Sequence, residues 1–291
     1  MGGRDLREIP IRELEIDAEL IAEYLSRRLR QYVFEHAGKS GGVVGLSGGL
    51  DSTVTAYIAA RALGPERVRC LILPTSVTPE EDLMDALTVV KELSIPESNY
   101  RIIDVDHVVE EISARADVAD RVVRGNIAAR VRMVFLHAVA ASTDSLVIGT
   151  SDKSELTIGY FTKYGDAGVD VMPIADLYKT QVRQLGMYLG IPERVLTKPP
   201  SPRLWRDHLA VDEIGMSYEL LDSILYLRFD MWMDSERVAE ELGVDASLVE
   251  RVERMVRSSQ HKRMMPEVFR IGFRSHGSDW RYPREWQPVS R

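Results

Sequence analysis

Short runs of apolar residues alternate along the first half of the chain with segments in which apolar residues recur at helical spacing. The runs lie at 43–46, 68–73, 100–105 and 145–150. They are continuously apolar, which is typical of strands buried on both faces of a parallel sheet. The intervening segments predict helices at 17–36, 52–63, 80–93, 106–115 and 126–141. This alternation predicts an α/β fold, a parallel β-sheet with helices on both faces.

The pattern changes after Tyr160. Residues 175–191 predict an amphipathic helix closed by Gly190, and a proline-rich break follows at 198–204. Further on, residues 212–263 are predicted to be wholly helical. We therefore expect a single domain over 1–291, with an α/β core at 17–190, a helical C-terminal segment at 205–263 and an irregular, aromatic tail at 266–291.

The segment 235–259 has the pattern of two short helices joined by a turn at Gly243. Taken alone, this pattern leaves two interpretations open, a DNA-reading helix-turn-helix and a packed helical hairpin. Glu250 and Glu253 lie on the second helix, where a DNA-reading surface would carry positive charge. The sequence therefore favours the hairpin.

The charge and the cysteine content narrow the class of protein. A formal net charge of −8 at pH 7 argues against nucleic acid as a partner. No apolar run approaches the roughly 18 residues of a membrane span, and the charged N-terminal stretch differs from a secretory signal. We expect a cytoplasmic protein without a membrane partner. The single cysteine, Cys70, excludes an internal disulfide and is expected to be a buried structural thiol.

A glycine-rich stretch, GLSGGLDS at 45–52, joins the first predicted strand to the next helix. Glycines let backbone N–H groups approach an anion, and the start of a helix adds positive potential. The stretch has neither the lysine of a Walker A loop nor the spacing of a dinucleotide-binding loop. It predicts a phosphate-binding loop of another kind. Asp51 is tolerable beside phosphates if a Mg²⁺ ion lies between them.

Part of this stretch, SGGLDS at 47–52, resembles the pyrophosphate loop of the N-type ATP pyrophosphatases. That resemblance implies that the loop holds the β- and γ-phosphates of ATP as a leaving group. Chemistry would then take place at the α-phosphate.

Later stretches narrow the resemblance. They are RGNIAARVRM at 124–133, GTSDKSELTIGYFTKYGDAGVD at 149–170, PIADLYKTQVRQL at 173–185, KPPSPRL at 198–204 and QHKR at 260–263. In this order they resemble the ammonia-dependent NAD synthetases, over about residues 20–265. The resemblance implies an adenine nucleotide alpha hydrolase-like fold, which is a Rossmann-like arrangement of three layers.

The resemblance also implies roles for matching positions. The ATP site would comprise Gly45, Leu46, Ser47, Gly48, Gly49, Leu50, Asp51, Ser52, Thr150, Lys179 and Ser201. The deamido-NAD site would comprise Arg130, Lys163, Asp170, His261 and Lys262. Asp51 and Glu155 would bind Mg²⁺ and form the catalytic set together with Asp170, a candidate for the base that deprotonates ammonium.

Two stretches depart from the family pattern. Ser201 keeps the hydroxyl of the family's threonine, but Pro202 and Arg203 replace an alanine and an aspartate. Asp152 and its neighbour Lys153 also differ from many bacterial members, and no role is carried over to them.

The implied reaction is the ATP-dependent amidation of deamido-NAD by ammonia, through an acyl adenylate, to give NAD, AMP and pyrophosphate as the final step of NAD biosynthesis. The family also implies a homodimer. A lone cysteine argues against a glutaminase part, so we expect ammonia that is free or delivered by another protein.

Two alternatives stay open at this point. One is another ATP pyrophosphatase, such as a tRNA-modifying enzyme, and the acidic charge and the FTKYGD stretch at 161–166 argue against it. The other is a non-catalytic nucleotide-binding module, and the presence of both Asp51 and Glu155 argues against that.

Overall fold

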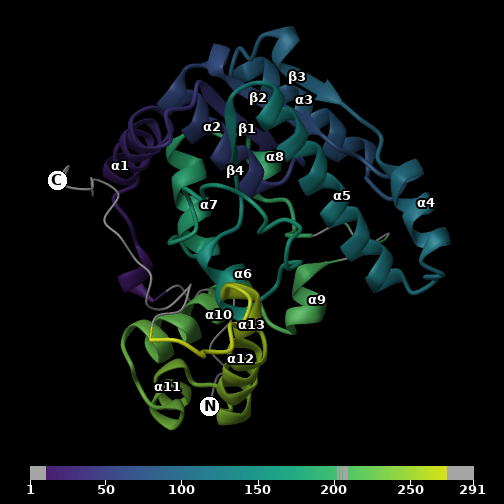
Figure 1. Cartoon of the computed structure of the whole chain (residues 1–291). Coiled ribbons are helices and arrows are strands. Elements are labelled where there is room, and N and C mark those ends of the chain that lie inside the picture. The colour runs from purple at the N-terminus through teal and green to yellow at the C-terminus, as the bar shows by residue number, and fades with distance from the viewer. Residues whose placement is uncertain (1–10, 202, 204, 206–208, 274–291) are drawn as a thin grey trace.

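The computed structural model describes residues 11–201, 203, 205 and 209–273, and its centre is a four-stranded sheet (Figure 1). The strand order is β3-β2-β1-β4, and every pairing is parallel. The strands are β1 Gly41–Gly45, β2 Val68–Ile72, β3 Tyr100–Ile102 and β4 Ser145–Ile148. The predicted parallel sheet is confirmed, although each strand ends before its apolar run does.

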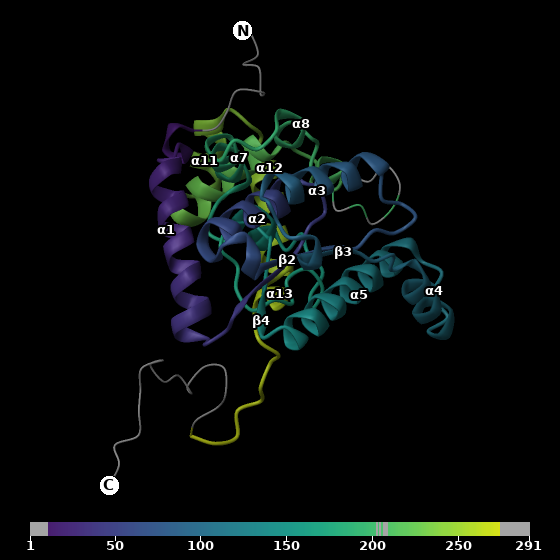
Figure 2. The ribbon, with the colours of Figure 1, turned by 90° about the horizontal axis from the view of Figure 1, so that it is seen from above.

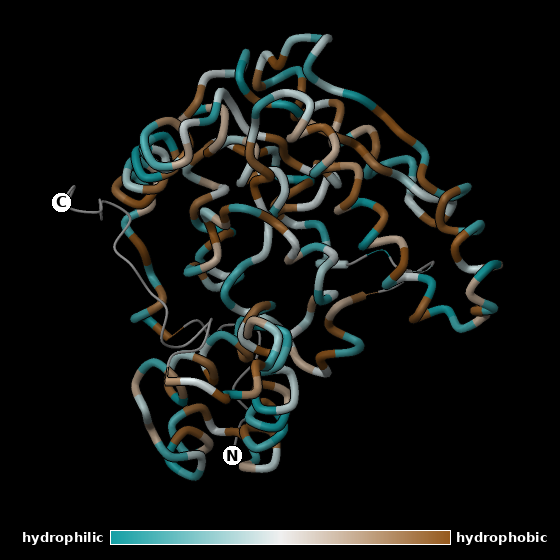
Figure 3. Tube along the Cα trace, viewed as in Figure 1, coloured by the Kyte–Doolittle hydropathy of each residue, from teal (hydrophilic) through white to brown (hydrophobic). Residues whose placement is uncertain are grey.

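Each face of the sheet has its own hydrophobic core, because neighbouring residues of a strand point to opposite faces. Val44 and Ile148 pack with α1 (Ala18–Gln31), α2 (Leu50–Leu63), α3 (Glu80–Glu92) and α7 (Lys179–Tyr188). Val43 and Val147 pack on the other face with α4 (Asp106–Arg115) and α5 (Arg121–Ser142). In Figure 2 the strands accordingly lie between α2 and α3 on one side and α5 on the other. Figure 3 shows the hydrophobic residues gathered along the strands and the hydrophilic ones on outward turns such as those of α1. The predicted three-layer arrangement is confirmed.

The helices of this part are α1 Ala18–Gln31, α2 Leu50–Leu63, α3 Glu80–Glu92, α4 Asp106–Arg115, α5 Arg121–Ser142, α6 Lys153–Ile158, α7 Lys179–Tyr188 and α8 Glu193–Leu196. A π-helical turn, Tyr32–His36, continues α1, and single 3₁₀ turns occupy Arg12–Leu14, Pro65–Arg67 and Glu97–Asn99.

Two predicted helix starts are wrong. Helix α5 begins at Arg121 rather than at 126, because the Asp120 carboxylate accepts hydrogen bonds from the N–H groups of Val122 and Val123, both at 2.9 Å. Helix α7 begins only at Lys179, so the first residues of the predicted helix at 175–191 form a loop. As a result, Lys179 stands at the very start of a helix.

The C-terminal helices are α9 Ala210–Ile214, α10 Tyr218–Leu225, α11 Ser235–Leu242, α12 Ala246–Ser258 and α13 Gln260–Arg263, with a π-helical turn at Tyr226–Asp230. Helices α9 to α12 surround a separate hydrophobic core that also takes in Ile158 of α6 and Tyr178. The helical part therefore packs directly against the ends of α6 and α7, as Figure 1 shows. The proposed division of the chain into segments stays a prediction.

The helical hairpin at 235–259 packs as the sequence favours. Val238 and Leu242 of α11 and Val249 of α12 are buried in the C-terminal core. Glu250 lies outside this core and pairs with Arg254 at 3.6 Å on the exposed face of α12. The hydrophobic face of the pair is thus used for packing.

Outside the helices, residues 266–273 form neither helix nor strand, and the rest of the predicted tail, 274–291, lies beyond the described residues. A search of the described residues finds no helix that is both long enough and apolar enough to cross a bilayer.

Candidate active site

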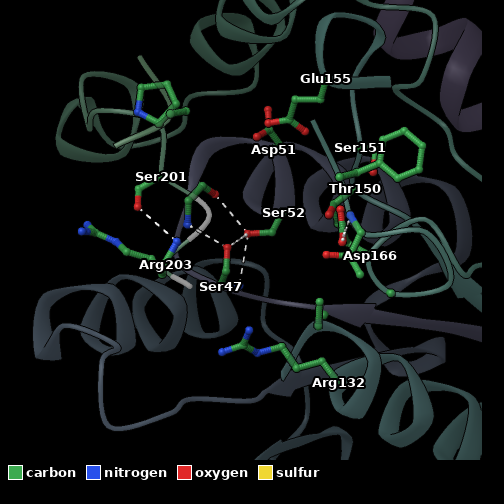
Figure 4. A pocket seen from close by; sticks show the side chains of 18 of the residues that line it. Ser47, Asp51, Ser52, Arg132, Thr150, Ser151, Glu155, Asp166, Ser201 and Arg203 are labelled. Carbon is green, nitrogen blue, oxygen red and sulfur yellow. Dashed lines mark hydrogen bonds between the residues drawn. The ribbon is translucent and has the colours of Figure 1, made fainter. Parts of the chain in front are cut away.

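A cavity of about 600 Å³ opens beyond the carboxyl ends of β1, β2 and β4. Its size falls within the usual range for sites that bind small molecules, and its position is the one at which parallel sheets bind ligands. It is lined by the glycine-rich loop, the end of β2, one face of α5, the 159–169 loop, the start of α7, residues 198–201, 203 and 205, and Lys262. Figure 4 shows part of this lining at close range.

The glycine-rich loop forms the turn between β1 and α2. Its hydroxyls bond within the loop: Ser47 Oγ and Ser52 Oγ lie 3.0 Å apart, and Ser52 Oγ donates to the Gly49 carbonyl at 3.1 Å (Figure 4). Gly48 has a φ of +78°, and a Cβ there would lie 2.1 Å from the Asp82 carbonyl oxygen. Only glycine fits at this point, where α3 presses against the loop.

Three carboxylates surround one buried ammonium at the start of α2, α6 and α7. Lys179 Nζ lies 2.6 Å from Asp51, 2.8 Å from Asp152 and 3.0 Å from Glu155. The Lys179 side chain is only 1% exposed. The predicted ATP and metal residues Asp51, Glu155 and Lys179 are therefore gathered at one point, beside the glycine-rich loop.

The charges in this cluster depend on one another. Burial disfavours the charged form of Lys179, but Asp152, Asp51 and Glu155 outweigh it and raise the pKa of the ammonium well above its usual value. Burial raises the pKa of the Asp152 and Glu155 carboxyls, and Lys179 opposes both shifts. Three carboxylates around one ammonium leave an excess of negative charge.

The cluster fits a divalent cation. One oxygen from each of Asp51, Asp152 and Glu155 can be chosen so that all lie within 4.8 Å of one another. Asp51 Oδ1 is buried and has no hydrogen-bond partner among the described residues. Carboxylate oxygens are the ligands that Mg²⁺ prefers. The residues present therefore fit a magnesium site, with Asp152 as a third carboxylate beside the two predicted.

Sequence reasoning missed Asp152, which is completely buried. Its side chain caps α6 by accepting a hydrogen bond from the Glu155 N–H at 2.8 Å. The signal was present, because an acid three residues before a glutamate is typical of a helix start after a strand. The cap explains why Glu155 projects from the first turn of α6.

Lys198 and Arg203 form ion pairs with buried acids of α3. Lys198 Nζ lies 2.8 Å from Asp82 Oδ1, contacts Asp85 and reaches the Gly48 carbonyl at 3.3 Å. Arg203 Nε donates to Asp82 at 2.8 Å, so the residue that replaces the family's aspartate pairs with an acid of α3. Ser201 lines the cavity and accepts the Arg203 N–H at 3.1 Å (Figure 4). The altered segment thus keeps its hydroxyl at the cavity wall.

Of the residues expected to hold deamido-NAD, only Lys262 lines the cavity, whereas Arg130, Lys163 and His261 lie outside its lining and are linked to one another by hydrogen bonds. An Arg130 N–H donates to the Lys163 carbonyl at 3.3 Å, and Lys163 Nζ donates to the His261 carbonyl at 2.6 Å. Lys262 lines the cavity and donates to the carbonyls of Gly159 and Phe161 at 2.7 and 2.8 Å. These hydrogen bonds link Lys163, in the 159–169 loop, to α13, and they link Lys262, in α13, back to the same loop.

Asp170 is placed differently from these residues. It is not among the cavity-lining residues, and its Oδ2 accepts a hydrogen bond from the Val147 N–H of β4 at 2.8 Å. A nearby acid that does line the cavity is Asp166, whose Oδ1 accepts the Thr162 N–H at 3.0 Å. Burial raises the pKa of the Asp166 carboxyl, while hydrogen bonds from backbone N–H groups, including that of Thr162, and the charges of Lys262 and Arg132 oppose the shift.

Two further cavity residues are not among the predicted site residues. Arg132 is held by a hydrogen bond from Nε to the Leu73 carbonyl at 2.9 Å, which brings its guanidinium to the end of β2 (Figure 4). Asn126 accepts a hydrogen bond from the Thr162 hydroxyl at 2.6 Å. Both lie on α5. The sequence predicted most of this helix but did not show which of its residues face the cavity. Thr150, which was predicted to contact ATP, also lines the cavity.

Comparisons with known proteins identify the family of the chain. The family model described as NAD synthase matches residues 21–266. The NH(3)-dependent NAD(+) synthetase of Sulfolobus acidocaldarius is 48% identical over 274 residues, which cover 94% of this chain and 97% of that protein.

Two solved structures share the fold. The NMN synthetase from Francisella tularensis has a TM-score of 0.77 and 31% identity, and the NH3-dependent NAD synthetase from Campylobacter jejuni has a TM-score of 0.74 and 30% identity. Each match covers 88% of this chain and 100% of the other. Because the family model spans most of the chain and the Sulfolobus protein is nearly half identical over almost all of it, this chain belongs to the NAD synthase family.

Proposed function

We propose that the cavity binds ATP at the glycine-rich loop and deamido-NAD beside Lys262, and that the chain joins them with ammonia to make NAD. The chain is a ligase that forms a carbon–nitrogen bond in the final amidation of NAD synthesis. One observation carries the site assignment. The Lys179 cluster and the glycine-rich loop meet at one wall of the cavity, and cationic side chains such as Arg132 and Lys262 line other parts of it.

ATP would lie with its β- and γ-phosphates on the glycine-rich loop. The backbone N–H groups there and the start of α2 favour negative charge. Asp51 and Glu155, with Asp152 behind them, would hold Mg²⁺, which neutralises phosphate charge when it is bound. Lys179 adds a fixed positive charge to the same wall. Ser201 and Thr150 supply hydroxyl groups at the cavity surface.

The first chemical step is the attack of the nicotinate carboxylate oxygen on the α-phosphorus of ATP. A bond forms between this oxygen and phosphorus, the bond to the bridging oxygen of pyrophosphate breaks, and pyrophosphate stays on the loop as the leaving group. The second step is the attack of ammonia on the acyl carbon, which releases AMP and gives the amide. The protein contributes mainly by positioning the reactants and stabilising charge, because they supply both nucleophiles.

Deamido-NAD would be held by the group around Lys163 and Lys262. Arg130 and His261 are joined to Lys163 through carbonyl contacts, so these residues form one connected surface. Cationic side chains there suit the pyrophosphate of a dinucleotide. The role predicted for Asp170 stays a prediction.

The nitrogen source is ammonia, free or delivered by another protein. Cys70 lies in β2, is completely buried, and burial raises the pKa of its thiol to about 12. Such a thiol is not the thiolate nucleophile that glutamine hydrolysis by a cysteine requires. Ammonia would enter the cavity as ammonium or as the free base.

A single assay tests the proposed reaction. Protein incubated with ATP, Mg²⁺, ammonium and deamido-NAD should form NAD, AMP and pyrophosphate in equal amounts, and chelation of Mg²⁺ with EDTA should stop all three. Chromatography of the nucleotides and a pyrophosphate assay give the readout. ADP as the product, or turnover that is independent of deamido-NAD, would contradict the proposal. A preference for nicotinate mononucleotide would instead assign NMN synthesis.

The base that takes a proton from ammonium can be identified by a matched pair of variants. We expect Asp166→Asn to lower kcat by about 10²- to 10⁴-fold, the usual contribution of a positioned general base, with little change in the KM for ATP. Asp170→Asn should lower kcat much less, because the Asp170 carboxylate accepts a hydrogen bond from the backbone of β4 and does not line the cavity. Steady-state rates at saturating substrate check this. The reverse order would give the role to Asp170.

A homodimer is the expected assembly. Helices α4 and α5 carry apolar side chains that stay 38–60% exposed in the single chain: Val108, Ile112, Val122, Val123 and Val134. Exposed apolar side chains on two neighbouring helices are typical of protein–protein contacts when they gather in a patch. Sedimentation equilibrium should give about twice the chain mass of 32.9 kDa. A chain that remains monomeric at micromolar concentration would rule the assembly out.

A further inference from the structure

Asp222 of α10 is a fully buried acid outside the cavity lining. Its carboxylate forms no ion pair within the part of the chain that the structure describes. Instead, Oδ1 accepts a hydrogen bond from the Ser154 hydroxyl at 2.5 Å, and Oδ2 accepts one from the Thr180 N–H at 2.9 Å. Burial raises the pKa of the carboxyl to about 7, and these two hydrogen bonds oppose the shift. A buried acid is costly unless its oxygens are satisfied, as they are here.

The two partners of Asp222 belong to the two helices that carry the active-site charges. Ser154 immediately precedes Glu155 on α6, and Thr180 immediately follows Lys179 on α7. Ser154 Oγ also accepts the Lys179 N–H at 2.9 Å. The first two N–H groups of α7 are thus satisfied by Ser154 and Asp222, although the first N–H groups of a helix have no partner inside it.

Asp222 therefore connects α10, on which it lies, with α6 and α7 through a short chain of hydrogen bonds. It belongs to the C-terminal helical part, while α6 and α7 line the ATP wall of the cavity. Its negative charge at the start of α7 is also favourable for that helix. A displacement of Asp222 would shift Glu155 and Lys179 relative to Asp51, which lies on α2 and has no hydrogen bond to Asp222 among the described residues.

We propose that Asp222 is a positioning residue for the ATP site, which holds Glu155 and Lys179 in register with Asp51 through Ser154 and the start of α7. It touches no substrate. The inference rests on the proposed function, since it concerns the same site. Deamido-NAD is expected to be insensitive to Asp222, because its proposed residues lie on α5, the 159–169 loop and α13.

The test compares Asp222→Asn with a matched control in the full chain. Asparagine keeps the size of the side chain but replaces one acceptor oxygen by an NH₂ donor, which cannot accept from both partners. We expect kcat/KM for MgATP to fall by about 10- to 100-fold, the order of loss that a small misplacement of reacting groups causes, and the Mg²⁺ concentration for half-maximal activity to rise. The KM for deamido-NAD should stay within about twofold, because its binding residues are not displaced.

The control is Ser223→Ala, at the next position of α10. Ser223 is equally buried, but its hydroxyl donates to the Glu219 carbonyl within its own helix at 2.8 Å. This variant should keep the wild-type constants. If Asp222→Asn does not fold, Ser154→Ala provides the test, because it removes the hydroxyl that lies between Asp222 and the Lys179 N–H. It should show the same fall in kcat/KM for MgATP with an unchanged KM for deamido-NAD. The double variant should lose no more than Asp222→Asn alone, because both act through one path.

The outcomes are distinct. An unchanged kcat/KM for MgATP in Asp222→Asn or Ser154→Ala, an equal rise in both KM values, or the same loss in Ser223→Ala would each overturn the positioning role. A lowered melting temperature with unchanged constants would also overturn it, because it would leave only a structural role. Failure of the wild-type protein to make NAD and AMP would overturn the proposed function instead. The two failures are therefore separable.

Discussion

The ammonium of Lys179, enclosed by the carboxylates of Asp51, Asp152 and Glu155, is the interaction on which the site depends. A charge that is only 1% exposed is stable in the interior only because its counter-charges lie within 3.0 Å. The carboxylates in turn would repel one another at this separation without it. The cluster consequently fixes the starts of α2, α6 and α7 with respect to one another. It also leaves an excess of negative charge of the kind that a divalent cation neutralises.

The sheet topology makes this meeting possible. Strands β1 and β4 are parallel neighbours, so the segments that follow them open at the same edge of the sheet. The first delivers the glycine-rich loop and Asp51, and the second delivers Asp152 and Glu155. The loop has no lysine of its own, yet two lysines from distant positions approach it. Lys179 reaches Asp51, and Lys198 reaches the Gly48 carbonyl while paired with the buried acids of α3.

The sequence predicted what local patterns and motifs can specify. Continuous apolar runs indicated the strands, the glycine-rich stretch indicated the phosphate loop, and the family resemblance indicated Asp51, Glu155 and Lys179. The hydrogen-bond and ion-pair partners around these residues could not be predicted, because they come from distant parts of the chain. Asp222 meets Thr180 across 42 positions, and Lys198 meets Asp82 across 116. Sequence spacing says nothing about such contacts. The family also pointed to Asp170, whereas burial and orientation in the 159–169 loop bring Asp166 to the cavity.

In the proposed reaction the glycine-rich loop holds the departing pyrophosphate while the nicotinate carboxylate attacks the α-phosphate. The most direct measurement follows the oxygen atoms of that carboxylate. Deamido-NAD labelled with ¹⁸O in its nicotinate carboxylate should transfer one labelled oxygen to AMP, because the oxygen that attacks phosphorus leaves with it when ammonia displaces the adenylate. Mass spectrometry of the products would detect this. Label in pyrophosphate or in released phosphate, with none in AMP, would contradict the account.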